Sequence, residues 1–488
     1  MKRKTVKKVS LIVFIVLLIQ LILPASVSAD TNLKAAASGT GSGTTTSATF
    51  GDVTGVTATV EATSGDKILV VATFQIELTK GDYTGFLRLV DTANPTNLHS
   101  ETFERTLSGV AKAEDKGIGS IVHIFTATTT DPTFSLQHST DAVKNLVTTG
   151  TIVAVPLVTT TGQAIDNVLK EYFGTETTTS ATFATVNGTD TSSGPDDPLT
   201  LPFAGHIYIA SSIESMMTTA GDAVGEWQLQ YKLSGDTWTN LGYPVERSMH
   251  TADEEGLVSL VGIVRELEAG NYYFRLLHRS LTGSTGTVQT EKANIVAVAL
   301  AVPDGDYLDV VEAYVSGDTT ISTSLEAAVS QTDYPPLTST NLFLHAQYSL
   351  SAPGATGDVD YPFFDLYVYD EDSTASRLDN DGTDGSLDQG RYLSDNSDKG
   401  SGSSVALSDS LTSGNHHTIS LRHATESGTT LTTDAYVVGF LLGYATGQPP
   451  IPEWPTLGLI LIGLVGIAGY AWIHLRKREK KKLLNNIN

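Results

Sequence analysis

One stretch of this sequence is written three times, and that repeat constrains the fold more than any other feature. The pattern is an apolar residue, a variable residue, leucine, a second variable residue and histidine, at residues 134–138, 274–278 and 419–423. The three final histidines lie 140 and 145 residues apart. Solenoid repeats have periods of about 20–50 residues. A period near 140 residues instead indicates three tandem copies of a whole domain.

Other landmarks recur in the same order. The sequence TTTSATF stands at residues 44–50 and again at 177–183, and a looser version stands at 319–325. Each histidine pattern is followed, after a Gly-, Ser- and Thr-rich gap, by an apolar segment. These apolar segments are residues 152–157, 295–300 and 437–442. The common order of the landmarks supports a triplicated unit.

The repeats read as β-structure. Residues 68–74 and 342–348 are rich in β-branched and aromatic residues, and clusters of Gly, Asp, Asn, Pro and Ser separate such segments. Residues 227–233 alternate apolar and polar positions, as a half-buried strand does. Many short strands in units of this size predict sandwiches or jelly rolls. We therefore predict an all-β fold of three tandem β-sandwich, jelly-roll-like domains at residues 44–164, 165–306 and 307–446.

Two kinds of segment break this pattern. Residues 165–173 have a short helical pattern, and we predict a linker helix there, with residues 307–315 at the corresponding place in the third repeat. Residues 30–43 are mostly Ala, Gly, Ser and Thr without an apolar period. That composition predicts a flexible leader.

The strand order, in which a late strand ending in histidine precedes an apolar closing strand, resembles the small jelly rolls of complement C1q and tumour necrosis factor type. The resemblance implies a jelly roll in preference to an immunoglobulin-like sandwich. Proteins of that type are often trimeric through one face of the roll. With three copies in one chain, the repeats could instead pack pseudo-symmetrically on one another.

The N-terminus has the features of a secretory signal peptide. Residues 1–29 begin with five Lys and Arg, continue through the apolar residues 11–23, and end in Val27, Ser28 and Ala29. Small residues at such a place favour cleavage by a signal peptidase. The apolar run has 13 residues, fewer than the ~20 that span a bilayer. We expect cleavage after Ala29, with retention as an anchor as the alternative.

The C-terminus has the features of a membrane anchor. Residues 447–455 form a Pro-rich stalk, and residues 456–475 have no formal charge. Twenty such residues span about 30 Å as a helix, enough to cross a bilayer. Residues 476–488 carry six Lys and Arg and should stay in the cytoplasm. Both termini thus place the repeats outside the cell.

The same C-terminal segment resembles the tripartite sorting signals that exosortases and archaeosortases read. A Pro-Glu-aromatic motif precedes the membrane segment and the basic tail, and it is similar to the PEF type best known from archaea. Its residues are Pro452, Glu453, Trp454 and Pro455. The resemblance implies cleavage near Glu453 and transfer of the ectodomain to another anchor, such as a lipid. Trp454 in place of the usual Phe and the longer tail depart from the family pattern, and a plain membrane anchor is the alternative.

Charge and cysteine content restrict the partners. The chain has 30 Lys and Arg against 54 Asp and Glu, and no cysteine. Eleven basic residues lie at the two ends, so residues 30–475 keep 19 basic and 53 acidic residues and a net charge of −34. Nucleic acid and anionic lipid are therefore poor partners for the exterior. Without disulfides, each unit must be stabilised by its own packing.

The candidate sites are few. His138, His278 and His423 share the parity of core-facing residues, and we expect each to be half-buried and hydrogen-bonded to a neighbouring loop. A metal site would need three or four converging ligands, and nothing else repeats beside each histidine. The unrepeated pair His416 and His417 is expected in a turn.

Two surface sites have weaker patterns. The loop at residues 379–388 is rich in oxygen ligands of the kind that calcium prefers. Its candidate ligands are Asp379, Asp381, Asp384 and Asp388, although the loop does not fit the EF-hand register. Asn187 begins the single Asn-Gly-Thr glycosylation sequence.

These observations favour an exported, surface-anchored structural or adhesive protein of a prokaryotic cell envelope. We do not expect an enzyme, because catalysis needs one asymmetric constellation, whereas a tandem array suits spacing or multivalent contact. The alternative is a carbohydrate-binding or calcium-dependent ligand-binding module, which a groove lined by Trp227, Trp238 and Tyr231 would favour. A surface hydrolase is the least favoured class. The expected partners are the membrane, a sorting enzyme, and glycans or other surface proteins, with calcium as the one cofactor considered.

Overall fold

β-branched and aromatic residues gather in short runs along this chain, and these runs form β-strands, since such side chains fit a pleated, half-buried surface. In the computed structural model, the 26 regular elements that can be described are all strands. The all-β prediction is therefore confirmed for this part of the chain. The structure describes residues 32–78, 83–98, 103–107, 115–141, 145–192, 198–217, 223–249, 255–281, 286–301, 307–336, 339–351, 362–379, 399–425 and 430–445.

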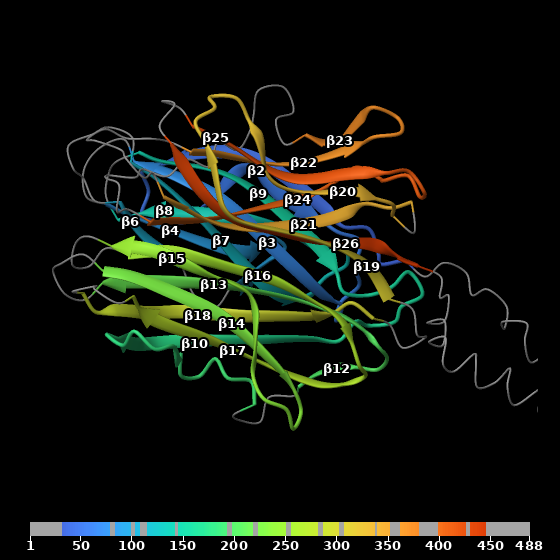
Figure 1. Ribbon diagram of the computed structural model, residues 1–488, viewed down its shortest axis with the longest axis horizontal. Helices are drawn as coiled ribbons and strands as arrows, with labels where there is room; N and C mark the ends of the chain where they lie inside the picture. Colours follow the sequence, from blue (N-terminus) through green and yellow to red (C-terminus); the bar gives the residue numbers. More distant parts are fainter. Residues whose placement is uncertain are drawn as a thin grey trace, which may run out of the picture. The chain divides into compact units, whose positions relative to one another are not determined.

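The strands form six antiparallel sheets, which follow one another along the chain as three pairs, from blue through green to red (Figure 1). In the first pair the strand orders are β1-β9-β3-β7 and β2-β8-β4-β5, with β6 beside β4. The bounds are β1 Ala37–Thr45, β2 Gly51–Thr59, β3 Lys67–Leu78, β4 Tyr83–Asp91, β5 Asn94–Leu98, β6 Phe103–Leu107, β7 Asp115–Thr126, β8 Thr133–Thr140 and β9 Leu146–Pro156.

The second pair repeats this topology. Its strand orders are β10-β18-β13-β16 and β11-β17-β14-β15, with β12 beside β17. The bounds are β10 Asn167–Thr178, β11 Ala184–Thr185, β12 Leu199–Leu201, β13 Gly205–Met217, β14 Ala223–Leu233, β15 Thr239–Met249, β16 Glu255–Leu267, β17 Gly270–Ser280 and β18 Val288–Ala299.

The third pair repeats it again, with orders β19-β26-β21-β24 and β20-β25-β22-β23. The bounds are β19 Tyr307–Thr320, β20 Glu326–Tyr334, β21 Leu342–Ser351, β22 Pro362–Asp370, β23 Ala375–Asp379, β24 Lys399–Leu407, β25 His417–Thr425 and β26 Leu431–Ala445. We call each pair a sandwich. Its first-named sheet is the inner sheet and its other sheet is the outer sheet.

Alternation along one strand shows why the inner sheets deserve that name. On β3, Ile68 and Val70 point into the core of the first sandwich. Leu69 and Val71, on the opposite face, join a buried cluster with inner-sheet residues of the second and third sandwiches. Successive side chains of a strand point to opposite faces. Each face of β3 is therefore buried, one within its sandwich and one between sandwiches, and all described residues belong to one compact unit.

The repeated Thr-Ser sequence builds the same turn three times. In the first sandwich the Ser47 N–H donates to Thr45 Oγ1 over 3.1 Å, and the Thr49 N–H donates to Ser47 Oγ over 2.9 Å. The Thr140 N–H then donates to the Ser47 carbonyl over 3.0 Å. The matching residues are Thr178, Ser180, Thr182 and Ser280, then Thr320, Ser322, Ser324 and Thr425. The looser third copy is thus a true equivalent.

Two predicted segments differ in the structure. The leader at residues 30–43 was wrong from residue 37 onward, because residues 37–45 form β1, which pairs with β9. The linker helix at residues 165–173 was also wrong, since residues 167–178 form β10, which pairs with β18. Residues 307–315 likewise belong to strand β19. Nine residues are too few to separate a helical from an extended pattern, and tertiary pairing decides such segments.

The signal peptide, the stalk, the membrane segment at residues 456–475 and the basic tail lie outside the described residues. Within the described residues, no helix is long and apolar enough to cross a membrane. The domain boundaries at residues 164 and 306 stay predictions.

Candidate functional site

The three repeat histidines occupy equivalent places. His138, His278 and His423 lie on β8, β17 and β25, each the second strand of its outer sheet. All three imidazoles are buried, so the expectation of half-burial was wrong, although their core-facing direction was right. Each Nδ1 meets a threonine hydroxyl on the closing strand of the inner sheet, and not a loop. The partners are Thr148 at 2.8 Å, Thr290 at 3.0 Å and Thr433 at 3.0 Å.

Burial decides the charge of these histidines. Removal from water lowers the pKa of His138 and His423, and it lowers the pKa of His278 to about 4. A buried site disfavours the charged imidazolium. The three rings are therefore neutral at neutral pH, and each forms a hydrogen bond between the two sheets of its sandwich.

Metal binding finds no support in the described part of the chain. There, no group of three or more His, Asp or Glu residues is placed to hold a metal ion. The predicted calcium ligands Asp381, Asp384 and Asp388, and the side chain of Asp379, lie outside the described residues. So do the sorting residues Pro452, Glu453, Trp454 and Pro455.

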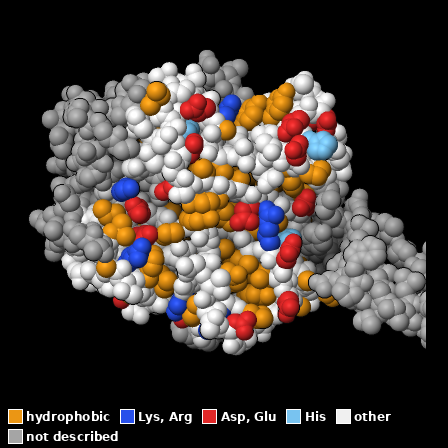
Figure 2. Space-filling model, viewed as in Figure 1, with side chains coloured by type: hydrophobic (Ala, Val, Ile, Leu, Met, Phe, Trp, Pro, Cys, Tyr) orange, Lys and Arg blue, Asp and Glu red, His pale blue; other side chains and the backbone are white. Residues whose placement is uncertain are grey.

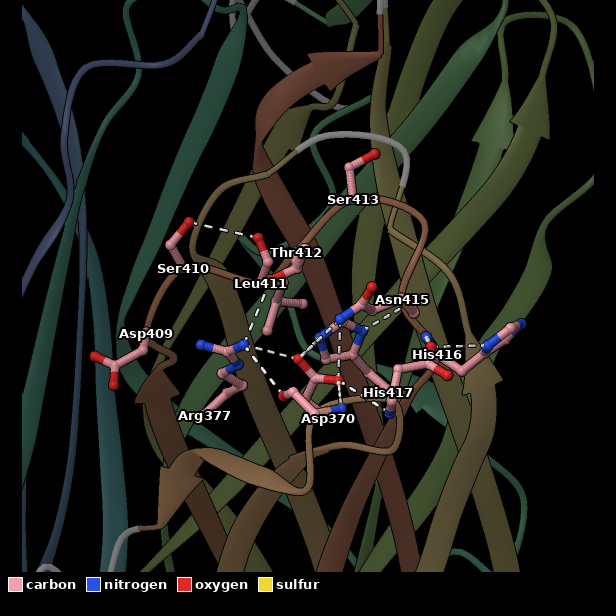
Figure 3. Close-up of polar contacts among 12 residues, drawn as sticks. Asp370, Arg377, Asp409, Ser410, Leu411, Thr412, Ser413, Asn415, His416 and His417 are labelled. Carbon is pink, nitrogen blue, oxygen red and sulfur yellow. Dashed lines mark hydrogen bonds and ion pairs between the residues drawn. The ribbon is translucent and has the colours of Figure 1, made fainter.

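A buried carboxylate organises one end of the third sandwich (Figure 3). Asp370, at the end of β22, is fully shielded from solvent. Its Oδ2 accepts a hydrogen bond from Arg377 Nη2 at 2.7 Å, and its Oδ1 accepts the Ser373 N–H at 3.0 Å. Asn415 Nδ2 lies 3.2 Å from both oxygens. Burial alone raises the pKa of Asp370, but these hydrogen bonds outweigh it and hold the pKa well below its usual range.

His417 lies against the same carboxylate. Its Nε2 is 3.7 Å from Asp370 Oδ2, and its Nδ1 is 3.1 Å from the Asn415 carbonyl. Both ring nitrogens face acceptors, so neither is available to take a proton from a serine. The neighbouring His416 is half exposed and pairs with Asp372 at 3.1 Å. Figure 3 shows these groups around a turn, where they hold the β22–β23 and β24–β25 connections together.

The aromatic residues proposed for a glycan groove do not line one. Trp227 is fully buried, and its Nε1 donates to Thr290 Oγ1 at 2.9 Å. Trp238 is half-buried, with Lys232 Nζ 4.5 Å and Arg275 Cζ 4.3 Å from its ring centroid. Cations over an aromatic face are attracted by its quadrupole. Tyr231 packs against the shared core.

The glycosylation sequence lies in a turn of the second sandwich. Asn187 is exposed, and its Nδ2 donates to both carboxylate oxygens of Glu176 at 2.9 Å. Gly188 has φ +81°, a conformation that favours glycine. Thr189 is buried, and its hydroxyl donates to the Val186 carbonyl at 2.7 Å. Occupancy of Asn187 stays a prediction.

The most extensive polar arrangement is a ring that joins the three sandwiches. On the edge strand of each inner sheet, one valine N–H points away from its own sheet and donates to a side chain of the next sandwich. Val122 donates to Ser212 at 2.9 Å, Val261 to Gln347 at 2.5 Å, and Val405 to Thr73 at 3.3 Å. The order runs from first to second, second to third, and third back to first. The ring is therefore closed.

The register shows that these bonds are equivalent. Thr73, Ser212 and Gln347 lie opposite Ser120, Ser259 and Ser403 in the β-ladders of their inner sheets. Each donating valine comes two residues after the serine of its own strand. Ser120 and Ser259 also meet each other, with their hydroxyl oxygens 2.6 Å apart. An unpaired strand edge invites unwanted pairing. Here each edge is covered by the neighbouring sandwich.

A second set of equivalent bonds lies where one sandwich passes to the next. The Ile165 N–H donates to the Leu157 carbonyl at 2.9 Å, and the Leu308 N–H donates to the Leu300 carbonyl at 3.0 Å. These two junctions are covalently continuous. At the third junction the Leu33 N–H donates to the Leu442 carbonyl at 2.9 Å, between the two ends of the described chain. The third junction is thus built like the others but is open.

Sequence reasoning missed this ring. Its one sequence signal is a polar residue inside an otherwise apolar strand, such as Thr73 in β3 and Gln347 in β21. Buried polar groups need partners. A polar position in a strand with two buried faces therefore indicates a contact, but it does not say with which strand.

Neither a protein-family model nor a characterised protein sequence matches this chain. Among solved structures, it is similar to the peptide-N-glycosidase PNGase F of Flavobacterium meningosepticum, with 9% identity over 57% of this chain and 96% of that chain, at a TM-score of 0.29. The tandem CBM22 domain of Paenibacillus barcinonensis Xyn10C has 11% identity over 56% and 93%, at 0.18. A triple jelly-roll protein of an archaeal virus has 10% identity over 84% and 90%, at 0.16. At TM-scores below 0.5, these likenesses carry no weight for the function of this chain.

Proposed function

We propose that this chain is an exported structural protein of a prokaryotic cell surface, whose three jelly-roll-type sandwiches form one rigid head on a single C-terminal anchor. The closed ring of edge-strand hydrogen bonds carries the proposal. It uses polar groups of the inner sheets to hold the sandwiches together. A head built in this way suits a load-carrying or spacing role, and an adhesive role is compatible with it.

The export and anchoring parts of the proposal rest on the two ends of the sequence. The signal peptide would deliver the head to the outside, and residues 456–475 would hold it at the membrane before any processing at Glu453. On the face seen in Figure 2, acidic, basic and small apolar patches are interspersed. Such a mixed surface suits a protein that remains in contact with water and salt.

We further propose that the chain is not an enzyme. Its buried histidines are held by threonine hydroxyls, and Asp370 is held by Arg377, Ser373 and Asn415. These groups support turns and sheet packing. Carbohydrate binding is the alternative, and the positions of Trp227 and Trp238 do not favour it.

The test uses cells that produce the full chain. A membrane-impermeant amine reagent applied to intact cells should label lysines of the head, such as Lys232, and leave Lys480, Lys481 and Lys482 of the tail unlabelled. Cells that lack the protein should lose resistance to osmotic or shear stress. Labelling of the tail without the head would overturn the topology. Unchanged envelope resistance together with selective binding of the purified protein on a glycan array would overturn the structural role in favour of carbohydrate binding.

A further inference from the structure

The first strand of the fold differs from its two counterparts. β1 reads ASGTGSGTT, and none of its side chains is buried. The equivalent edge strands β10 and β19 bury apolar side chains, including Val168 in β10 and Val310 and Val311 in β19. Burial of such side chains contributes about 1.5–3 kcal/mol each. β1 lacks this contribution.

What holds β1 in place is its backbone. Nine consecutive residues, Ala37 to Thr45, pair with β9 without a register shift, whereas β10 and β19 both show shifts against their partners. One side-chain bond joins the two strands, between the hydroxyls of Thr40 and Thr151 at 3.1 Å. This is the arrangement found when a separate strand adds to a sheet edge.

The place that β1 occupies selects glycine. A Cβ added to Gly39 would lie 2.0 Å from the Thr57 carbonyl oxygen, and one added to Gly41 would lie 2.0 Å from the Thr54 carbonyl oxygen. Both obstacles are backbone atoms of β2, so a flexible side chain cannot make room. The slot between β9 and β2 therefore accepts a strand with glycine at alternate positions and excludes others.

An apolar anchor precedes the strand. Leu33 is 5% exposed and belongs to the core shared by the three sandwiches. Besides its bond to Leu442, this segment is held by the Lys34 N–H, which donates to the Val158 carbonyl at 3.0 Å. Lys34 Nζ also pairs with Asp66 at 3.0 Å. Residues 32–45 thus combine a main-chain ladder, a glycine code and one side-chain anchor at the open junction of the ring.

We propose that residues 32–45 are an exchangeable joint between copies of this protein. The segment leaves its own slot and enters the equivalent slot of a second copy, where the same ladder with β9 and the same Leu33 site receive it. Reciprocal exchange gives a closed pair, and one-way exchange gives an open chain of heads. This inference deepens the proposed structural role and rests on it, because linked heads on one surface would form a continuous layer.

Exchange has a small energetic barrier in this design. The ladder lost in one copy is regained in the other, and no large apolar side chain of β1 must cross water. Exchange of an identical element between protomers is a low-cost route to assembly. The turn at residues 46–50, which joins β1 to β2, is the hinge.

The experiment uses the absence of cysteine from the natural chain. Ser42 and Thr149 lie directly opposite each other in the β1–β9 ladder. Opposed residues of antiparallel strands have Cβ atoms about 4.5–5.5 Å apart, close enough for a disulfide after a small shift. Full-length Ser42→Cys and Thr149→Cys proteins are purified in detergent, mixed and oxidised. A cross-link between positions 42 and 149 then requires the strand of one copy to lie in the slot of the other.

The expected yield of this cross-link is about tenfold above that of a control mixture, because the slot raises the local concentration of the two thiols. The control pairs Ser42→Cys with Ser234→Cys, a residue exposed on the second sandwich. Adding Gly41→Val to the Ser42→Cys chain should abolish the excess, whereas Thr40→Val, on the exposed side of the same strand, should preserve it.

Equal yields in the two mixtures would overturn the proposal, and so would an excess that survives Gly41→Val. Neither result depends on where the protein lies in the cell. Failure of the joint can therefore be distinguished from failure of the surface role, which the labelling of intact cells tests.

Discussion

The Tyr208 hydroxyl lies 2.7 Å from Nδ1 of His345, and this hydrogen bond joins the second sandwich to the third. The other ring nitrogen of His345 lies 2.8 Å from Ser403 Oγ. All of these groups are buried. In the register of the inner sheets, Tyr208 stands where the first and third sandwiches have Leu69 and Phe343. The bond therefore marks one boundary of the ring and distinguishes it from the other two.

Tyr208→Phe should destabilise the protein by about 1–3 kcal/mol, because it leaves a buried ring nitrogen without its partner. Adding His345→Val should recover most of this loss, since the first sandwich has Val71 at the same position and replacing both partners by apolar groups is nearly neutral. Urea unfolding of the two variants measures the coupling. Tyr231→Phe serves as the control. Equal stability of Tyr208→Phe and the natural protein would contradict the assignment.

Stability should fall as the pH falls from about 6.5 to about 4. Burial lowers the pKa of His278 to about 4 and that of His345 to about 3, below the value of 6.5 expected in the unfolded chain. Within this window the unfolded chain binds more protons, so each histidine removes about 1.4 kcal/mol of unfolding free energy per pH unit. Above pH 6.5 its contribution is fully present. Urea unfolding of the natural protein and of His278→Gln at pH 7, 6 and 5 should show a shallower slope for the variant, and His416→Gln, at an exposed position, should leave the slope unchanged.

Arg377→Ala should destabilise the third sandwich by roughly 3 kcal/mol, because it removes the cation that pairs with a carboxylate buried from solvent. Asp372→Ala provides a matched control in the same turn, where the pair with His416 is half exposed. Exposed pairs contribute about 0–1 kcal/mol. Thermal unfolding of both variants gives the comparison. A smaller effect for Arg377→Ala than for Asp372→Ala would refute the structural role of Asp370.

Ser212→Ala should weaken the ring, because the Val122 N–H on a buried edge strand loses its acceptor. An unsatisfied buried donor costs about 1–3 kcal/mol. Ser38→Ala, at an exposed position of β1, should change stability by less than about 0.5 kcal/mol. Calorimetry should also show one unfolding transition, since inner-sheet residues of all three sandwiches share a core. Three separate transitions would contradict the ring as a unit of stability.

The C-terminal sorting motif leads to a prediction on mature protein from its natural host. If a sorting enzyme reads Pro452 to Pro455, intact mass should show a chain that ends near Glu453. Glu453→Ala should then leave the full-length form in the membrane. A carboxylate in a stalk outside the bilayer contributes almost nothing to insertion of residues 456–475, so the variant should insert normally. A mature chain that still carries residues 476–488 would refute processing.

Much of the fold could be predicted because its signals are local. A strand with period-two alternation places residues on the core side whatever its partner is, and this parity correctly placed His138, His278 and His423. The repeated Thr-Ser turns were also recognisable, since each hydroxyl bonds within two residues of its own position. The candidate ligands of the calcium loop and of the sorting motif lie outside the described residues and stay predictions.

By itself, the sequence determined that this chain is a triplicated β-protein, because alternation and repetition are properties of short segments and their order. Tertiary structure alone decided that residues 37–45 are a strand and not a leader, and that residues 167–178 extend along β18. It also decided that Val122, Val261 and Val405 close a ring. The physical reason is common to all three. A glycine-rich strand, a short ambiguous segment and an edge N–H are each stabilised by a partner at least 80 residues away in the sequence, and no local pattern encodes which partner that is.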